Sequence, residues 1–188
     1  AVHKGDATAI EWPAFIDEHG LGQNIKIVAN LPYNVGTPLF VGWLNQMSLF
    51  GTMSLMFQKE VAQRICAKPG SNHYGRLAVL SHAVIEPRMA FTLPPGAFKP
   101  PPKVASAVVS AKPLAEDKAY LHLDALQTVT AAAFGQRRKM LRASLKQIMP
   151  QGATTEQLLE SVSIDPTRRA ETLSQQEFRD LTTAWKAL

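Results

Sequence analysis

The sequence predicts an α/β sheet portion followed by a small helical portion. Short apolar runs alternate with helical patterns up to about residue 113, and this alternation is typical of an α/β sheet. After Pro113 the residue pattern changes, and helical stretches follow one another with no strand pattern between them. We place the boundary near residues 112–118 and expect two domains, over 1–113 and 114–188.

The first half of the chain reads as two strand–helix pairs. Residues 25–30 form a short apolar run, and Thr37 is a candidate cap for a helix with Pro38 at its first position. A second β-prone run covers 52–57, and residues 58–60 open another helix.

The remaining elements are separated by turn residues. A helical pattern covers 74–85, and two strands, 88–93 and 104–111, flank a proline-rich stretch. Residues 1–7 read as the end of a strand that runs into a loop. The expected helices of the second portion are 120–134, 136–148, 154–162 and 174–187.

Composition restricts the class of protein. The chain of 188 residues is 46% hydrophobic and 19% charged, as a globular protein is. It has no apolar run near 18 residues and no basic-then-apolar leader, so we expect a cytoplasmic protein with no membrane association. The single cysteine, Cys66, excludes an intrachain disulfide and a cysteine-based zinc site. A net charge of +5 favours an anionic binding partner.

The most informative motif is Asn30-Leu31-Pro32-Tyr33, directly after the first strand. Asn30 offers an amide carbonyl, Pro32 interrupts a continuing ladder, and Tyr33 offers a flat face for stacking. Such a turn can hold a planar exocyclic amine. The alternative is a plain proline turn after a strand, with Tyr33 in the core.

Asp6 and Gln58, like Asn30, each follow an apolar run and so lie where open α/β sheets bind their ligands, beyond the carboxyl ends of the strands. Asp6 could accept hydrogen bonds from a ribose or an adenine amino group, or could be an ordinary loop acid. Gln58 is expected to satisfy the backbone where its strand ends. The prolines of 100–102 could hold Phe98 rigidly over a base, or could form a stiff linker or a partner-binding segment.

A basic stretch lies in the second portion. Residues 136–148 hold five cations and no acid, a composition that favours a phosphate-tracking surface over an ordinary solvated face. As one helix, 136–148 would place Leu141, Leu145 and Ile148 on an apolar stripe with Phe134. The cations are Arg137, Arg138, Lys139, Arg142 and Lys146, and all but Arg137 would share one flank of that helix.

Metal-dependent and covalent catalysis have little support. The five histidines show no close metal-ligand spacing, so we expect no metal site. No nucleophile elbow, zinc-protease helix motif or P-loop is present.

Taken together, the motifs resemble the ribosomal RNA adenine N6-dimethyltransferase family, which is related to the erythromycin-resistance methyltransferases. The resemblance runs nearly end to end and keeps the family's order. Its segments are Asn30-Leu31-Pro32-Tyr33-Asn34 with Thr37-Pro38-Leu39, then 58–64, Tyr74-Gly75-Arg76-Leu77, 98–109, 134–139 and 165–171.

The resemblance implies part of a Rossmann-like S-adenosylmethionine-dependent fold with a small all-α rRNA-recognition domain. It implies dimethylation of adjacent adenines in small-subunit ribosomal RNA during ribosome biogenesis, by a monomer that acts on the small ribosomal subunit. Asn30, Leu31 and Pro32 would bind the target amine, Tyr33 and Phe98 would stack on its base, and the cofactor would contact Asp6, Ala7 and Asn30. The RNA contacts would be Lys103, Arg137, Arg138, Lys139, Arg142 and Lys146.

The sequence also departs from the family. Members open with a glycine-rich G-x-G loop that holds S-adenosylmethionine and with an acid that binds its ribose, and the sequence before Asp6 contains neither. About the first third of a typical member is therefore expected to lie outside the chain, which alone should be inactive. Two alternatives stay open: a non-catalytic RNA- or ribosome-binding module, and a methyltransferase for DNA adenine or a glutamine amide.

Overall fold

The computed structural model describes residues 2–22, 24–32 and 34–188, and it divides into two compact units. Unit 1 contains the chain up to Cys66 together with Val84–Ala119, and unit 2 contains Ala67–Ala83 together with Tyr120–Leu188. The predicted boundary near residue 113 thus lies shortly before the structural one at 119. Residues 67–83, which the sequence assigns to the first portion, pack with the C-terminal helices instead.

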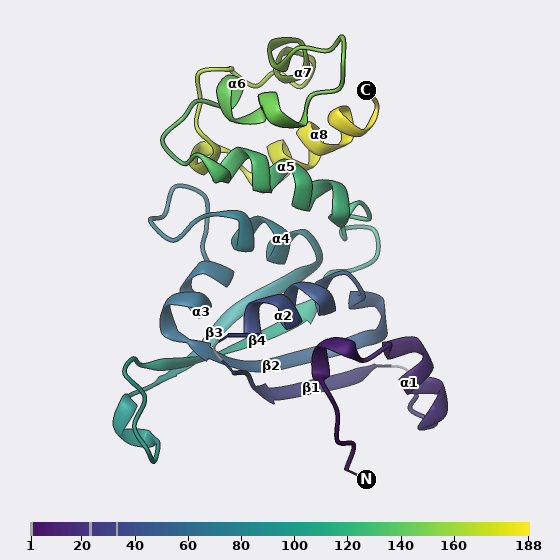
Figure 1. Ribbon diagram of the computed structural model, residues 1–188, viewed down its shortest axis with the longest axis vertical. Helices are drawn as coiled ribbons and strands as arrows, with labels where there is room; N and C mark the ends of the chain where they lie inside the picture. Colours follow the sequence, from purple (N-terminus) through teal and green to yellow (C-terminus); the bar gives the residue numbers. More distant parts are fainter. Residues whose placement is uncertain (1, 23, 33) are drawn as a thin grey trace. The chain divides into compact units, whose positions relative to one another are not determined.

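Unit 1 is built on a mixed sheet with the order β1-β2-β4-β3 (Figure 1). β1 pairs with β2 in parallel, whereas β4 pairs antiparallel with both β2 and β3. β3 is an edge strand, which explains how it accommodates Pro87. The strands are β1 (Ile25–Asn30), β2 (Phe50–Gln58), β3 (Ile85–Leu93) and β4 (Ser106–Pro113).

Helices cover the sheet of unit 1. α3 contacts β2, β3 and β4, and Phe40 of α2 meets Phe57 of β2 edge to face, with 5.6 Å between the ring centroids. Met53 and Leu55 are fully buried beneath these helices, so β2 forms the centre of the core. The helical elements are η1 (Ala7–Ala9), α1 (Trp12–Glu18), α2 (Gly36–Leu44), η2 (Met47–Leu49), α3 (Lys59–Ile65) and η3 (Pro95–Ala97).

Unit 2 is helical. α5 packs against α8, and Leu126, Leu145 and Phe178 are fully buried in its core. Thr154 and Ser174 begin α7 and α8 with complete capping boxes, which fix both starting points. The elements are α4 (Arg76–Val84), α5 (Leu123–Gly135), α6 (Leu141–Ser144), η4 (Leu145–Ile148), α7 (Thr155–Ser161), η5 (Ala170–Thr172) and α8 (Gln175–Lys186).

The α/β prediction is confirmed, and β1 has the predicted bounds. Three local predictions are wrong. Residues 2–5 belong to no strand of the described sheet. Thr37 does not cap α2, because the Gly36 N–H bonds the Pro32 carbonyl at 2.9 Å and the helix starts from that turn. Residues 136–140 are not helical, since α5 ends at Gly135 and α6 begins at Leu141.

No helix in the described part of the chain has both the length and the apolar character needed to cross a membrane.

Candidate functional site

Polar side chains gather at one end of the sheet in unit 1. Asn30 is the last residue of β1 and lies opposite Met56, two residues before β2 ends at Gln58. Gln58 in turn lies opposite Ser106, the first residue of β4, which also faces Leu93 at the end of β3. The register therefore brings Asn30, Gln58 and the whole 94–105 connection to the same edge, where open α/β sheets bind their ligands.

The turn after Asn30 is anchored by backbone hydrogen bonds. The Leu31 N–H donates to the Met56 carbonyl at 3.3 Å, so the turn is joined to the end of the β1–β2 ladder. The Pro32 carbonyl accepts from the Val35 and Gly36 N–H groups, at 3.3 and 2.9 Å. Leu31 is buried while Asn30 and Pro32 are exposed, so the turn holds its polar side chain outward on a fixed backbone.

Gly36 is a site-supporting residue that the sequence reasoning missed. A Cβ atom at this position would lie 3.1 Å from the Leu31 Cβ and 3.7 Å from the Phe57 ring. Beneath the turn lies a cavity of only about 10 Å³, lined in part by Leu31, Gly36 and Gln58, with room for at most one water. The turn is therefore closely packed from below. A glycine four residues after the motif proline was the available signal.

Gln58 differs from its predicted role. Its side chain makes no capping bond to α3, so the backbone-satisfying role expected for it is not seen. Instead it lines an open pocket of about 320 Å³ together with Lys59, Glu60 and Ala105. The Lys59 N–H donates to the Ala105 carbonyl at 2.9 Å, which ties the start of α3 to the connection before β4.

The connection between β3 and β4 carries two predicted site residues. Phe98 follows η3 and is half-buried, and Lys103 is exposed shortly before β4. The connection that carries them leaves β3 at Leu93 and enters β4 at Ser106. These two residues face each other at the end of the sheet that holds Asn30. Tyr33, the predicted partner of Phe98 in stacking, lies outside the described residues.

Asp6 and Ala7 lie at the start of η1, which contacts α2. Asp6 caps η1: one carboxylate oxygen accepts from the Thr8 hydroxyl at 2.7 Å and the Thr8 N–H at 2.8 Å. These two hydrogen bonds hold the pKa of Asp6 below its usual value, and the bond from the Thr8 hydroxyl has the larger effect. Asp6 is therefore an ionised, exposed acceptor at neutral pH.

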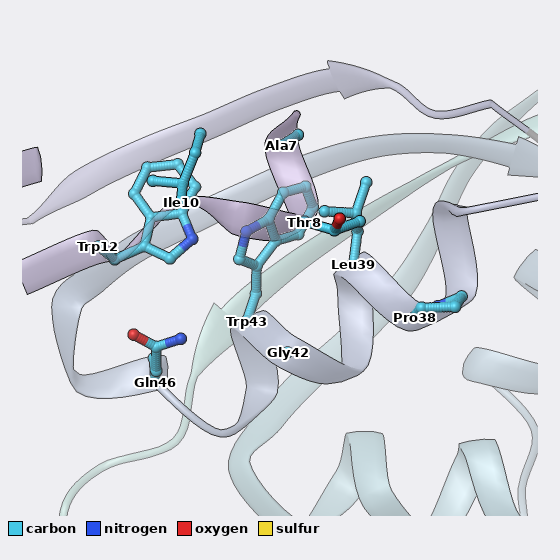
Figure 2. A pocket seen from close by; sticks show the side chains of 9 residues that line it. All are labelled: Ala7, Thr8, Ile10, Trp12, Pro38, Leu39, Gly42, Trp43 and Gln46. Carbon is cyan, nitrogen blue, oxygen red and sulfur yellow. The ribbon is translucent and has the colours of Figure 1, made fainter. Parts of the chain in front are cut away.

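Ala7 lines a pocket of about 250 Å³ between the η1–α1 stretch and α2 (Figure 2). The indoles of Trp12 and Trp43 lie on its walls with their centroids 6.5 Å apart, and Thr8 and Gln46 contribute polar groups. Most of its lining residues are aromatic or aliphatic, but polar and apolar groups are exposed to the pocket in about equal measure.

The predicted RNA-binding residues fall in both units. Lys103 belongs to unit 1, and the other five lie in unit 2. We call residues 136–146 the basic segment; its five cations are all exposed. The single helical flank predicted for four of them is wrong: Arg138 and Lys139 lie with Arg137 in a turn, whereas Arg142 lies in α6 and Lys146 in η4.

Long-range backbone bonds set the shape of the basic segment. The Leu141 and Arg142 N–H groups donate to the carbonyls of Arg168 and Pro166, at 2.8 and 3.1 Å. These partners satisfy the free N–H groups at the start of α6, so the helix begins there. Arg137 donates from its guanidinium to the Asn72 carbonyl at 3.0 Å. The 165–171 motif thus supports the basic segment, a role that its sequence does not reveal.

The described residues include no group of three or more histidine, cysteine or acidic side chains arranged to hold a metal ion. Cys66 ends α3 half-buried, and burial raises the pKa of its thiol to about 11. The thiol is therefore protonated at neutral pH and is a weak nucleophile.

Comparison with known proteins gives a consistent family. A family model described as "Ribosomal RNA adenine dimethylase" matches residues 1–186. The chain is 59% identical over 156 residues to the ribosomal RNA small subunit methyltransferase A of Gluconobacter oxydans, covering 83% of the chain and 50% of that protein. The protein of the same name from a Chelativorans species is 51% identical over 177 residues, covering 93% and 61%.

Two solved structures share the fold. A dimethyladenosine transferase from Plasmodium falciparum superposes with a TM-score of 0.77 at 24% identity, covering 96% of this chain and 70% of that one. The 23S rRNA methyltransferase ErmE gives 0.58 at 19% identity, covering 87% and 66%. The chain spans between half and two thirds of the length of the curated relatives named above.

Proposed function

The chain belongs to the ribosomal RNA adenine dimethylase family, and from this premise we propose that it is the substrate-facing part of an enzyme that dimethylates N6 of adjacent adenines in small-subunit rRNA. The methyl donor would be S-adenosylmethionine, and dimethylation would take place in the cytoplasm during ribosome biogenesis. The observation that carries the proposal is the Asn30–Pro32 turn, which holds an exposed amide at the carboxyl end of β1 on a backbone bonded to β2.

The proposed chemistry depends on positioning. The adenine N6 amine is a weak nucleophile because its lone pair is delocalised into the ring. The Asn30 side-chain carbonyl and the Leu31 backbone carbonyl would accept its two hydrogens and draw the nitrogen towards a tetrahedral form. Transfer would require alignment at roughly 3–3.5 Å, so that the bond from N6 to the methyl carbon forms as the methyl–sulfur bond breaks. No strong general base would be needed, because the methylated ammonium loses its proton readily to water.

The base itself would be flipped out of the RNA and stacked between Tyr33 and Phe98. Support for the Phe98 side is topological: the 94–105 connection starts from the edge at which Asn30 ends β1. The cavity of about 10 Å³ lined by the turn is too small for a purine, so the base would lie outside this cavity.

Asp6, Ala7 and Asn30 fit the cofactor in their chemistry. Asp6 is an ionised acceptor suited to an adenine amine, and Ala7 borders a pocket whose walls include the indoles of Trp12 and Trp43. S-adenosylmethionine would supply the electrophilic methyl group. We assign to this chain only the adenine-side and methyl-side contacts of the cofactor.

Unit 2 would recognise rRNA through the basic segment, and the protein would act as a monomer on the small ribosomal subunit. Five exposed cations without an acid are suited to phosphate contacts, which position a protein on nucleic acid. Lys103 would add a contact from unit 1.

A second candidate is an RNA- or ribosome-binding module without catalysis, for which the five exposed cations of the basic segment would also be suited. Methylation of small-subunit rRNA by the complete gene product separates the two, and titration of labelled S-adenosylmethionine into the 188-residue chain tests whether the chain binds the cofactor by itself. We expect that this chain does not bind S-adenosylmethionine at micromolar concentrations. We expect the complete gene product to methylate rRNA. Failure of that longer protein to methylate small-subunit rRNA would contradict the enzyme proposal and favour the binding module.

A further inference from the structure

A second polar surface of unit 2 lies beside the basic segment. An open groove of about 470 Å³ runs between the start of α4, the exposed side of α5 and η4, and we call it the α5 groove. Its polar lining consists of Arg76, Gln127, Thr128 and Gln147, and Ala131 and Ala132 give it a small-residue floor. All of these residues belong to unit 2.

The charge of the α5 groove is one-sided. No aspartate or glutamate lines it, and among the described residues none forms an ion pair with Arg76. Arg76 is exposed, so its guanidinium is available to an anion from outside. Lys146 immediately precedes Gln147 in the chain, so the groove adjoins the basic segment.

The neutral side chains add hydrogen-bonding capacity. The Thr128 hydroxyl donates to the Asp124 carbonyl of its own helix at 3.2 Å, which leaves its oxygen able to accept. The Gln147 amide nitrogen donates to the Ser144 carbonyl at 3.3 Å, which leaves its carbonyl oxygen and a second hydrogen. A guanidinium beside such donors and acceptors matches a phosphate next to a ribose hydroxyl.

We propose that the α5 groove binds the sugar–phosphate backbone of RNA, with Arg76 on a phosphate and with Thr128 and Gln147 on the neighbouring 2′-hydroxyl. This inference rests on the proposed function, because it extends the rRNA surface beyond the basic segment. The volume is in the range of sites for small organic groups and so suffices for one nucleotide. RNA is distinguished from DNA at such a site by its 2′-hydroxyl.

The charge part of the proposal is tested with the 188-residue chain and an in vitro transcript of small-subunit rRNA, titrated over a range of salt. Loss of one phosphate contact lowers affinity and reduces the slope of log K against log salt by about 1. For Arg76→Gln we expect a roughly three- to tenfold rise in Kd with that reduction in slope. Arg76→Lys should keep the slope. Lys112→Gln removes an equal charge at the far end of β4 in unit 1 and serves as the matched control.

The ribose part is tested with a single-stranded DNA copy of the same sequence. Gln147→Ala and Thr128→Val should weaken binding of the transcript and leave DNA binding unchanged. Circular dichroism checks that each variant is folded. If Arg76→Gln changes Kd and slope no more than Lys112→Gln, the groove proposal is wrong. It is equally wrong if Arg76→Gln weakens binding to whole small subunits but not to naked rRNA, since the groove would then hold a ribosomal protein.

The two proposals fail in distinguishable ways. A double variant, Arg138→Gln with Lys139→Gln, tests the basic segment alone. If it loses rRNA affinity while Arg76→Gln does not, the proposed function stands and the α5 groove is excluded. If neither variant changes the affinity, rRNA recognition by unit 2 fails as a whole.

Discussion

The Asn30–Pro32 turn in unit 1 and the basic segment in unit 2 are built in opposite ways. The turn carries no charged residue, and its backbone is fixed by the Leu31–Met56 bond and by close contact with Gly36. The basic segment exposes five cations, and two carbonyls of the 165–171 motif anchor the start of its short helix. A site for chemistry needs positions held to fractions of an ångström, whereas phosphate binding mainly needs charge.

The sharpest test of this difference is the substitution Asn30→Ala in the complete gene product. The substitution removes an acceptor required only when the amine is aligned for attack, so we expect methylation to slow by at least about 100-fold. Affinity for rRNA should stay within about twofold, because no phosphate contact is lost. Methylation kinetics and filter binding measure the two quantities.

Asn72→Ala is the matched control for that experiment. It removes the same side chain from an exposed loop of unit 2 while its carbonyl can still accept from Arg137. Near-normal methylation by Asn30→Ala would contradict the proposed mechanism, as would an equal loss in both variants.

A second test targets the packing beneath the turn. In Gly36→Ala the new Cβ meets Leu31 at 3.1 Å, so the turn or α2 must shift. We expect the free energy of unfolding to fall by about 1–3 kcal/mol, with slower methylation. Gly42→Ala in the same helix meets nothing within 4 Å and should leave stability unchanged or raise it by up to about 1 kcal/mol. Urea unfolding measures both, and equal effects would show that the close approach is unimportant.

The comparison also shows how far sequence patterns reach. β1 has the predicted bounds because an apolar run before a proline turn is a local signal. Gly36 escaped notice because its role depends on contacts with Leu31 and Phe57, and Phe57 belongs to another strand. The roles assigned to Asn30, Leu31, Pro32 and Phe98 stay predictions.

In unit 2 the same limit appears in the helix predicted over 136–148. Its cations and its buried Leu141 and Leu145 suit a helical pattern, and both leucines are indeed fully buried. The break at 136–140 comes from bonds between the start of α6 and the carbonyls of Pro166 and Arg168. Partners so distant in the sequence leave no trace in local periodicity.

A third test reverses a charge in the basic segment. Arg138→Glu should raise the Kd for rRNA by roughly tenfold and reduce the salt slope by between about 1 and 2, because a phosphate contact is replaced by repulsion. At saturating rRNA the methylation rate of the longer gene product should be unchanged. Arg88→Glu, on the edge strand β3 opposite Ser110, is the control. An equal change in both variants would show that net charge alone, and not the basic segment, governs binding.

The smallest expected effect concerns acid, to which the two regions should respond differently. Glu177 forms an ion pair with Arg168, whose backbone carbonyl anchors α6. Burial raises the pKa of Glu177, but hydrogen bonds from Arg168 and Ser174 outweigh it and hold the pKa below its usual value. The folded state therefore binds fewer protons than the unfolded state. The stabilisation is complete above the usual pKa of about 4.5 and is lost as the pH falls through the lower folded-state value.

Because the pair is partly exposed, its contribution should be below about 1 kcal/mol. Glu177→Gln should lower the free energy of unfolding at pH 7 and leave a smaller difference between wild type and variant at pH 3. Urea titrations at both pH values measure this, with Glu60→Gln on α3 as a control, since Glu60 pairs with Arg64 on an exposed helix face of unit 1. The turn at Asn30–Pro32 contains no ionisable side chain and should keep its hydrogen-exchange protection at Leu31 over the same pH range, relative to the exchange rate of an unstructured peptide. If Glu177→Gln has the same effect at both pH values, the ion pair does not supply the acid dependence of unit 2.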